Sequence, residues 1–95
     1  MIKLFTVISG REIVGTLQDS PDGSYKIKSP MVVHPVQQSS ESYGLTLYPY
    51  SPSNPDGAHL FNRDLIISES DSVPDDLETN YIRETSGISI VTSLK

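Results

Sequence analysis

The chain has 95 residues, enough for one domain with one small core, because a chain this short cannot divide its buried surface between two cores. It contains no cysteine, which excludes a disulfide framework, a thiolate metal site and a cysteine nucleophile. Twelve acidic residues against seven basic ones give a net charge of −5, which argues against non-specific binding to duplex nucleic acid.

No targeting or membrane-spanning segment is recognisable in the sequence. Met1 is followed directly by the apolar stretch 2–8, without a basic region or a cleavage site, and no 18 consecutive residues are apolar. Together with the lack of cysteine, this predicts a cytoplasmic protein that does not enter a membrane.

An alternating apolar pattern predicts a hairpin at the amino terminus. Residues 2–8 alternate with period two and carry apolar side chains on both faces of a strand, so we expect both faces to be covered. Ser9-Gly10 supplies a tight turn, and residues 12–18 alternate again. Gly15 in this second strand predicts a sharp bend or a close approach of two backbones.

Three further strands are expected after a turn at residues 20–23. The first covers 25–33, and Pro30 and Pro35 predict that it is kinked or lies at an edge, because proline has no N–H to donate. The polar segment 34–42 is interpreted as a loop. The last two strands are expected at 43–48 and 60–68, on either side of a proline-rich loop at 51–57.

A helix is expected at about 73–86. Ser72 and Asp75 have the spacing of a capping box, Pro74 suits the first helical turn, and the apolar residues of the segment share one face at period 3.6. Such a helix is long enough to lie across a barrel mouth. We expect residues 87–95 to form a short extended tail that can pair with an exposed edge.

The sequence resembles the Sm-like (LSm) family. The run LFTVISGREIVGTL (residues 4–17) resembles the first Sm motif, in which a strand, a glycine turn and a second strand with G-x-L follow one another. The likeness covers about residues 2–69. The segments SPMVV, LTLYPY and SGISIV are most similar to short Sm-like proteins encoded by tailed phages of cyanobacteria.

The resemblance implies a fold of the all-β (mainly β) class. Its architecture would be a small, strongly bent five-stranded antiparallel barrel of the Sm-like or SH3-like kind. The single domain would span residues 1–95, with the barrel at about 1–69 and one C-terminal helix. The resemblance also implies a closed homo-oligomeric ring, in which the fourth strand of one subunit pairs with the fifth strand of the next, and RNA binding around its pore. A helix after the barrel, instead of before the first strand, departs from the family pattern.

The RNA contacts of the family lie in two loops. The loop after the second strand carries an Asp and an Asn with an aromatic residue between them, and the loop before the fifth strand carries Arg-Gly. Here the first loop offers Asp19, Asp22 and Tyr25 without the Asn. The second loop offers Asn62-Arg63-Asp64, with Asp in place of Gly.

In the RNA-binding interpretation, Tyr25 stacks on a base while nearby cations meet phosphates. The alternative is that Tyr25 packs on the barrel mouth and the lysines keep a strand face soluble, which the net charge of −5 favours. The candidate RNA-binding residues are Asp22, Tyr25, Lys26, Lys28, Asn62 and Arg63.

The fourth and fifth strands carry the candidate subunit contacts. An unpaired strand edge invites aggregation unless another chain covers it, so we favour a subunit contact over simple packing for Tyr48, Tyr50 and Phe61 beside the proline-rich loop. The candidate interface residues are Leu45, Leu47, Tyr48, Tyr50, Leu65, Ile66 and Ile67.

Nothing in the sequence indicates catalysis. His34 and His59 lack a second ligand at helical spacing, so they are interpreted as surface histidines and not as zinc ligands. There is no nucleophile elbow and no phosphate-binding glycine loop before a helix. We therefore expect no enzyme activity, no catalytic residue, no metal and no cofactor.

Two functions remain open. The first, which we adopt as the main hypothesis, is a homo-oligomeric ring that binds single-stranded RNA weakly or conditionally, as an RNA chaperone in a phage-infected cell. The second is a protein-binding or structural oligomeric module of the same fold, whose acidic helix or Tyr/Pro loop recruits a partner protein. The altered loop motifs and the acidic charge favour the second function, and the mildly basic amino-terminal part supports the first.

Overall fold

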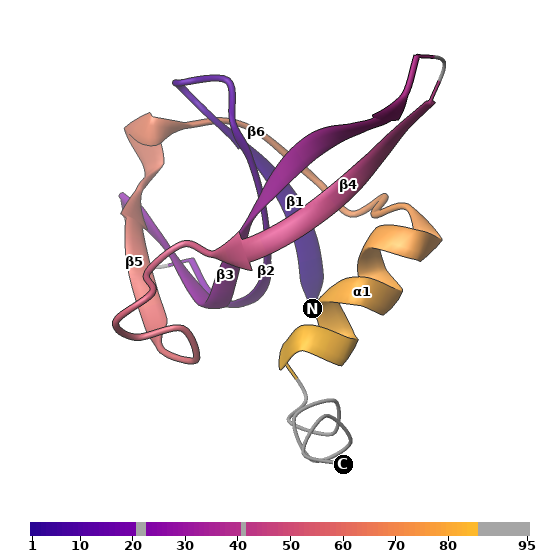
Figure 1. Cartoon of the computed structure of the whole chain (residues 1–95). Coiled ribbons are helices and arrows are strands. Elements are labelled where there is room, and N and C mark those ends of the chain that lie inside the picture. Colours follow the sequence, from indigo (N-terminus) through magenta and orange to yellow (C-terminus); the bar gives the residue numbers. More distant parts are fainter. Residues whose placement is uncertain (21–22, 41, 86–95) are drawn as a thin grey trace, which may run out of the picture.

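The computed structural model describes residues 1–20, 23–40 and 42–85, which form a six-stranded antiparallel sheet and one α-helix (Figure 1). The mainly β fold with a single helix after the strands, expected from the sequence, is confirmed. The strands are β1 (Ile2–Val7), β2 (Glu12–Asp19), β3 (Ser24–Ser39), β4 (Ser42–Pro49), β5 (Ala58–Asn62) and β6 (Ile66–Ser70), and the helix is α1 (Asp75–Thr85).

The sheet is strongly curled but does not close into a barrel, so the expected closed barrel is wrong. The strand order is β4-β3-β2-β1-β6, and β5 pairs with the first half of β3. Closure would require β6 to pair with β4 or β5. In the part of the chain that the structure describes, β6 is the last strand of the sheet and pairs only with β1.

The expected count of five strands is also wrong, because the stretch 60–68 is two strands and not one. A turn of 3-10 helix (Arg63–Leu65) separates β5 from β6. The side-chain oxygen of Asn62 accepts a hydrogen bond from the backbone N–H of Asp64 at 3.0 Å and so caps this turn. The turn redirects the chain, so β5 pairs with β3 while β6 pairs with β1.

The sharp bend expected at Gly15 lies opposite a kink in β3. The pairing of β2 with β3 shifts register between Val14 and Thr16. A Cβ on Gly15 would overlap the Cγ2 atom of Ile27, so glycine permits the close approach here. On β3, Ser29 has a φ of 51°, which breaks the strand into a half that pairs with β5 and a half that pairs with β4.

The prediction of a loop at 34–42 is wrong, because β3 continues to Ser39 and β4 begins at Ser42. His34 pairs with Thr46 and Gln37 pairs with Tyr43, so cross-strand hydrogen bonds hold a polar segment in a hairpin that extends away from the rest of the sheet (Figure 1). Beyond Val33 this hairpin has no β2 partner, which agrees with the edge position that Pro35 indicated.

Both faces of the sheet are covered, as the apolar alternation of β1 predicts. Neighbouring side chains of a strand point to opposite faces, and Ile13 and Val14 belong to different cores. The inner core, inside the curl of the sheet, consists of Phe5, Ile13, Ile27 and Phe61. The helix-side core consists of Val14, Met31, Val33, Leu77 and Tyr81.

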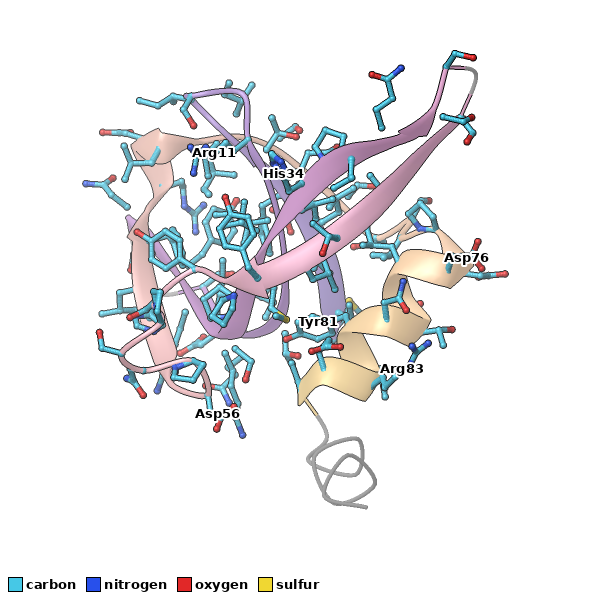
Figure 2. The ribbon with its side chains drawn as sticks, in the orientation of Figure 1. Arg11, His34, Asp56, Asp76, Tyr81 and Arg83 are labelled. Atoms are coloured by element: carbon cyan, nitrogen blue, oxygen red, sulfur yellow. The ribbon has the colours of Figure 1, made fainter. Side chains whose placement is uncertain are left out.

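Helix α1 covers the outer face of the sheet. Its observed span agrees with the expected 73–86 to within two residues, and the expected tail at 87–95 lies outside the described residues. Tyr81 is 2 % exposed, and its hydroxyl donates to the Lys28 carbonyl at 3.0 Å and lies 2.9 Å from the Thr16 hydroxyl (Figure 2). Burial raises the pKa of Tyr81, so the hydroxyl stays protonated and keeps the helix attached to β2 and β3.

Candidate functional site

Two of the candidate RNA-binding residues lie together at one corner of the sheet. Tyr25 lies on β3 and Arg63 begins the 3-10 turn, and the Arg63 guanidinium carbon lies 4.9 Å from the centre of the Tyr25 ring. The backbone N–H of Arg63 donates to the Gly23 carbonyl at 2.9 Å. The two loops that the resemblance assigns to RNA therefore meet, through one backbone hydrogen bond and one cation–π contact.

The same corner contains two carboxylates that the sequence analysis did not assign to it. Glu69 on β6 accepts from the Tyr25 hydroxyl at 2.8 Å and from the Lys3 ammonium at 2.6 Å, and Lys3 also lies 3.0 Å from the Asp71 carboxylate. We call these five residues, Lys3, Tyr25, Arg63, Glu69 and Asp71, the Tyr25 cluster.

Hydrogen bonding in the Tyr25 cluster shifts three pKa values. The Lys3 ammonium, donating to Glu69, holds the pKa of that carboxyl below its usual value, with Tyr25 adding to the effect. The hydrogen bond to Glu69 raises the pKa of Lys3, and the same acceptor raises the pKa of Tyr25. Lys3 and Glu69 thus stay charged and paired near neutral pH. Of the two cations in the cluster, Lys3 and Arg63, Lys3 is therefore already paired with carboxylates.

The other candidate RNA-binding residues are not part of this cluster. Lys26 and Lys28 are exposed and alternate with Tyr25 and Ile27 along β3, so they lie on the opposite face of the strand. The Asn62 side chain caps the 3-10 turn, and Asp22 lies outside the described residues. A single surface that includes all six candidates is therefore not formed within one chain.

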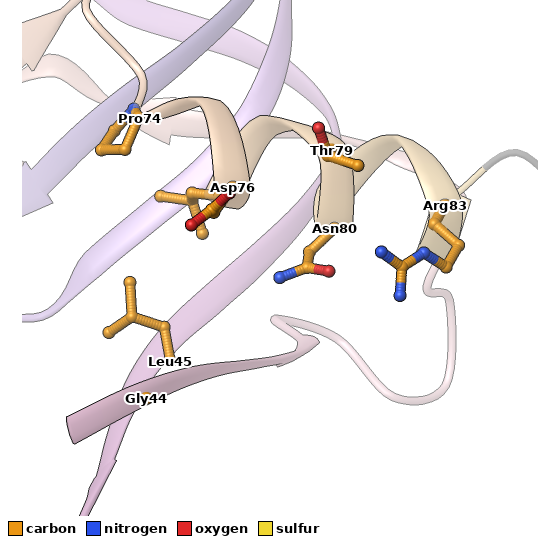
Figure 3. A pocket seen from close by; sticks show the side chains of 8 residues that line it. Gly44, Leu45, Pro74, Asp76, Thr79, Asn80 and Arg83 are labelled. Atoms are coloured by element: carbon orange, nitrogen blue, oxygen red, sulfur yellow. The ribbon is translucent and has the colours of Figure 1, made fainter. Parts of the chain in front are cut away.

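The candidate interface residues divide into packed and exposed groups. Leu47 packs against the helix-side core and Ile66 against the inner core. Leu45 is 49 % exposed and lines a groove of about 490 Å³ between β4 and α1, which Asp76, Thr79, Asn80 and Arg83 border from the helix (Figure 3). The exposed members away from this groove are Tyr48, Tyr50, Leu65 and Ile67.

The aromatic residues beside the proline-rich loop are not one site. Tyr50 packs its ring 4.9 Å from Phe61 and 5.9 Å from His59. The Tyr48 ring instead lies 6.2 Å from the ring of His34, and its hydroxyl accepts from Arg11 at 3.5 Å. Tyr48, His34 and Arg11 line a hollow between the β1–β2 turn and the projecting hairpin. The sequence gives no signal for this hollow, because the three residues are distant in the chain.

Among residues 1–20, 23–40 and 42–85, three strands pair along one edge only. Strand β4 pairs only with β3, β5 pairs only with β3, and β6 pairs only with β1. Their outer backbone N–H and C=O groups are therefore available to another chain. Ile67 on β6 is 63 % exposed and Leu60 on β5 is 68 % exposed, so apolar side chains accompany two of these edges.

Within the described ranges, no group of three or more His, Asp or Glu side chains could hold a metal ion. The helix found in those ranges is too short and too polar to cross a membrane. No protein-family model matches the chain, and comparison with curated proteins finds no match.

Proposed function

We propose that this protein is a self-assembling module, in which an outer strand of one copy pairs with an outer strand of the next. The observation that carries the proposal is the strand order β4-β3-β2-β1-β6, which leaves β4 at one end of the sheet and β6 at the other, each with one unpaired edge in the described chain. Pairing β6 of one copy with β4 of the next joins two different surfaces, so the contact is head to tail and closes into a ring if the rotation permits.

The exposed apolar side chains support this assembly. An edge strand that carries Ile67 or Leu60 in contact with water invites uncontrolled pairing unless a partner covers it. The curl of the sheet favours a ring over a flat ribbon, because each added copy would turn the path of the strands. This arrangement is the one that the resemblance to Sm-like proteins implies, and the proposal keeps that family as its hypothesis.

A charge placed on the β6 edge tests the proposal. Ile67→Lys should convert the assembly to a monomer at micromolar concentration, because a lysine on an edge strand opposes pairing with another strand. Ile82→Lys is the matched control: Ile82 is 48 % exposed on α1 and belongs to none of the strands with a free edge, and the substitution adds the same charge. Sedimentation velocity should show a smaller species for Ile67→Lys alone. Equal sizes for both variants and the wild type would contradict edge pairing through β6.

A second candidate function is the binding of single-stranded RNA by this assembly. The observation that favours it is the contact of Arg63 with Tyr25 and with the Gly23 carbonyl, which joins the two loops at one corner of each copy. Repetition around a ring would place several such corners on one surface. The carboxylates of Glu69 and Asp71 reduce the attraction for phosphate, so the affinity would be low and strongly dependent on salt.

Fluorescence anisotropy with U-rich and A-rich RNAs, at low and at physiological salt, tests the RNA function. The double variant Tyr25→Ala, Arg63→Ala should lose the binding seen at low salt. Absence of binding by the wild type at low salt would reject the RNA function, and equal binding by the double variant would reject this corner as the site.

A further inference from the structure

The hollow beside Arg11, which we call the notch, results from a difference in strand length. Strand β2 begins at Glu12, whose partner on β3 is Val33, while β3 continues to Ser39 in partnership with β4 alone. The edge of β3 beyond Val33 therefore faces the β1–β2 turn across a space of about 460 Å³. This volume lies within the range of about 300 to 1,000 Å³ that is typical of small-molecule sites.

Arg11 supplies a positive charge that no carboxylate neutralises by an ion pair in the described part of the chain. The Arg11 side chain donates one long hydrogen bond, 3.5 Å, from Nη1 to the Tyr48 hydroxyl. Lys3 in the Tyr25 cluster, by contrast, forms ion pairs with both Glu69 and Asp71. Arg11 is thus a cation that can receive an anionic ligand without first breaking an ion pair.

The notch also presents aromatic surface next to that charge. The rings of His34 and Tyr48 meet edge to face at an interplanar angle of 61°, and both side chains are exposed. Figure 2 shows His34 and Arg11 on the same side of the molecule, between the turn and the hairpin. Glu12 is the carboxylate among the residues that line the notch, and it can accept hydrogen bonds from hydroxyl or amino groups.

We propose that the notch binds a nucleoside phosphate, with the phosphate on Arg11, the base against the rings of His34 and Tyr48, and a sugar hydroxyl on Glu12. One exposed arginine holds an isolated phosphate only weakly, and the net charge of −5 opposes any anion. Stacking of a base on an aromatic ring supplies the additional attraction. The inference does not rest on the proposed assembly, because the notch lies on the side of β3 away from the outer edge of β4.

Backbone amide NMR with three probes tests the proposal directly. Adenosine monophosphate should shift the amide signals of Gly10, Arg11, His34 and Tyr48, and it should bind more tightly than adenosine or inorganic phosphate. Equal affinity for phosphate and for adenosine monophosphate would overturn the role of the base. Shifts confined to other residues, or no shift at millimolar nucleotide, would overturn the site.

Three variants locate the charge and the ring. Arg11→Gln should weaken binding about tenfold or more, as expected for the loss of a hydrogen bond between charged groups. Tyr48→Leu should weaken it about fivefold or more, as expected for the loss of stacking on a base. Arg83→Gln, which makes the same substitution on α1 away from the notch, should leave binding unchanged, and an effect equal to that of Arg11→Gln would overturn the assignment.

A nucleoside phosphate can be free or part of an RNA chain, and a short oligoadenylate distinguishes the two sources. Binding of the oligonucleotide that is at least tenfold tighter than that of the mononucleotide, and sensitive to Arg11→Gln, assigns the site to RNA. Equal or weaker binding assigns it to the free nucleotide. Oligonucleotide binding that depends on Tyr25 and Arg63 but not on Arg11 would support the Tyr25 corner and overturn the notch.

Discussion

The two faces of the sheet are completed in different ways. On the outer face, α1 covers the helix-side core, and the buried Tyr81 hydroxyl has its hydrogen bonds to Thr16 and Lys28 within the same chain. On the inner face, the core side chains are also buried, with Phe5 and Ile27 at 0 % exposure, but the strands β5 and β6 that border them have free edges.

Burial of a core and completion of a sheet are therefore separate requirements. Apolar side chains can be covered by curling a small sheet, while backbone groups at the edges need another strand. The helix-side core depends on contacts inside the chain, while the outer strands of the sheet offer contacts to a second molecule. Substitutions on the two faces should therefore have different consequences.

The largest effect is expected from Tyr81→Ala. Loss of this buried ring should destabilise the chain by about 3 kcal/mol or more, as large-to-small aromatic substitutions in a core do. Urea unfolding followed by circular dichroism measures the change. Because Tyr81 is buried within its own chain, the assembly should keep its size below the unfolding transition.

Tyr81→Phe separates the hydroxyl from the ring. It leaves the Lys28 carbonyl and the Thr16 hydroxyl without this partner, so we expect a loss of about 1 to 3 kcal/mol. A Phe variant as stable as the wild type would show that the two hydrogen bonds do not hold α1 on the sheet.

A moderate effect is expected from Gly15→Ala, at the bend that gives the inner face its curl. The added Cβ would displace the Ile27 side chain from the inner core, and forced repacking of this kind costs about 1 to 3 kcal/mol. The cost should be smaller in an Ile27→Ala background, where the overlapping methyl is absent. The same cost in both backgrounds would show that the strain arises elsewhere.

The smallest effect is expected from Glu69→Gln, which removes the ion pair with Lys3 at the rim of the inner face. The folded-state pKa of Glu69 is lowered, so its contribution to stability is present above the usual carboxyl pKa of about 4.3 and is lost as the pH falls through the folded-state value. The stability difference between wild type and variant should therefore shrink on acidification. Asp64→Asn, at an exposed carboxylate without an ion pair in the described chain, is the control for the loss of one negative charge.

Local patterns predicted much of the fold. The alternation of β1 and β2, the bend at Gly15 and the helix after Pro74 follow from residues close in the chain, and each is observed. The segment 34–42 was misassigned because its polar composition conceals a pairing with β4 that only the tertiary structure supplies. The break after Asn62 had a local signal, since an Asn two residues before Asp64 can cap a turn.

The candidate site was less accessible to sequence reasoning. The meeting of Tyr25 with Arg63 was expected only through the family resemblance. Glu69 and Lys3 were not anticipated beside them, because 66 positions separate the two in the chain and ion pairs at that distance have no periodic signature. Arg11, His34 and Tyr48 converge on the notch for a similar reason: the unequal lengths of β2 and β3, and not a motif, bring them together.

The mass of the wild-type protein in solution is the most direct test of the proposed assembly. Multi-angle light scattering across a dilution series should give a defined multiple of 10.4 kDa that persists at micromolar concentration. A stable species of 10.4 kDa at every concentration would contradict the account, because the edges of β4 and β6 would then remain unpaired in the functional protein.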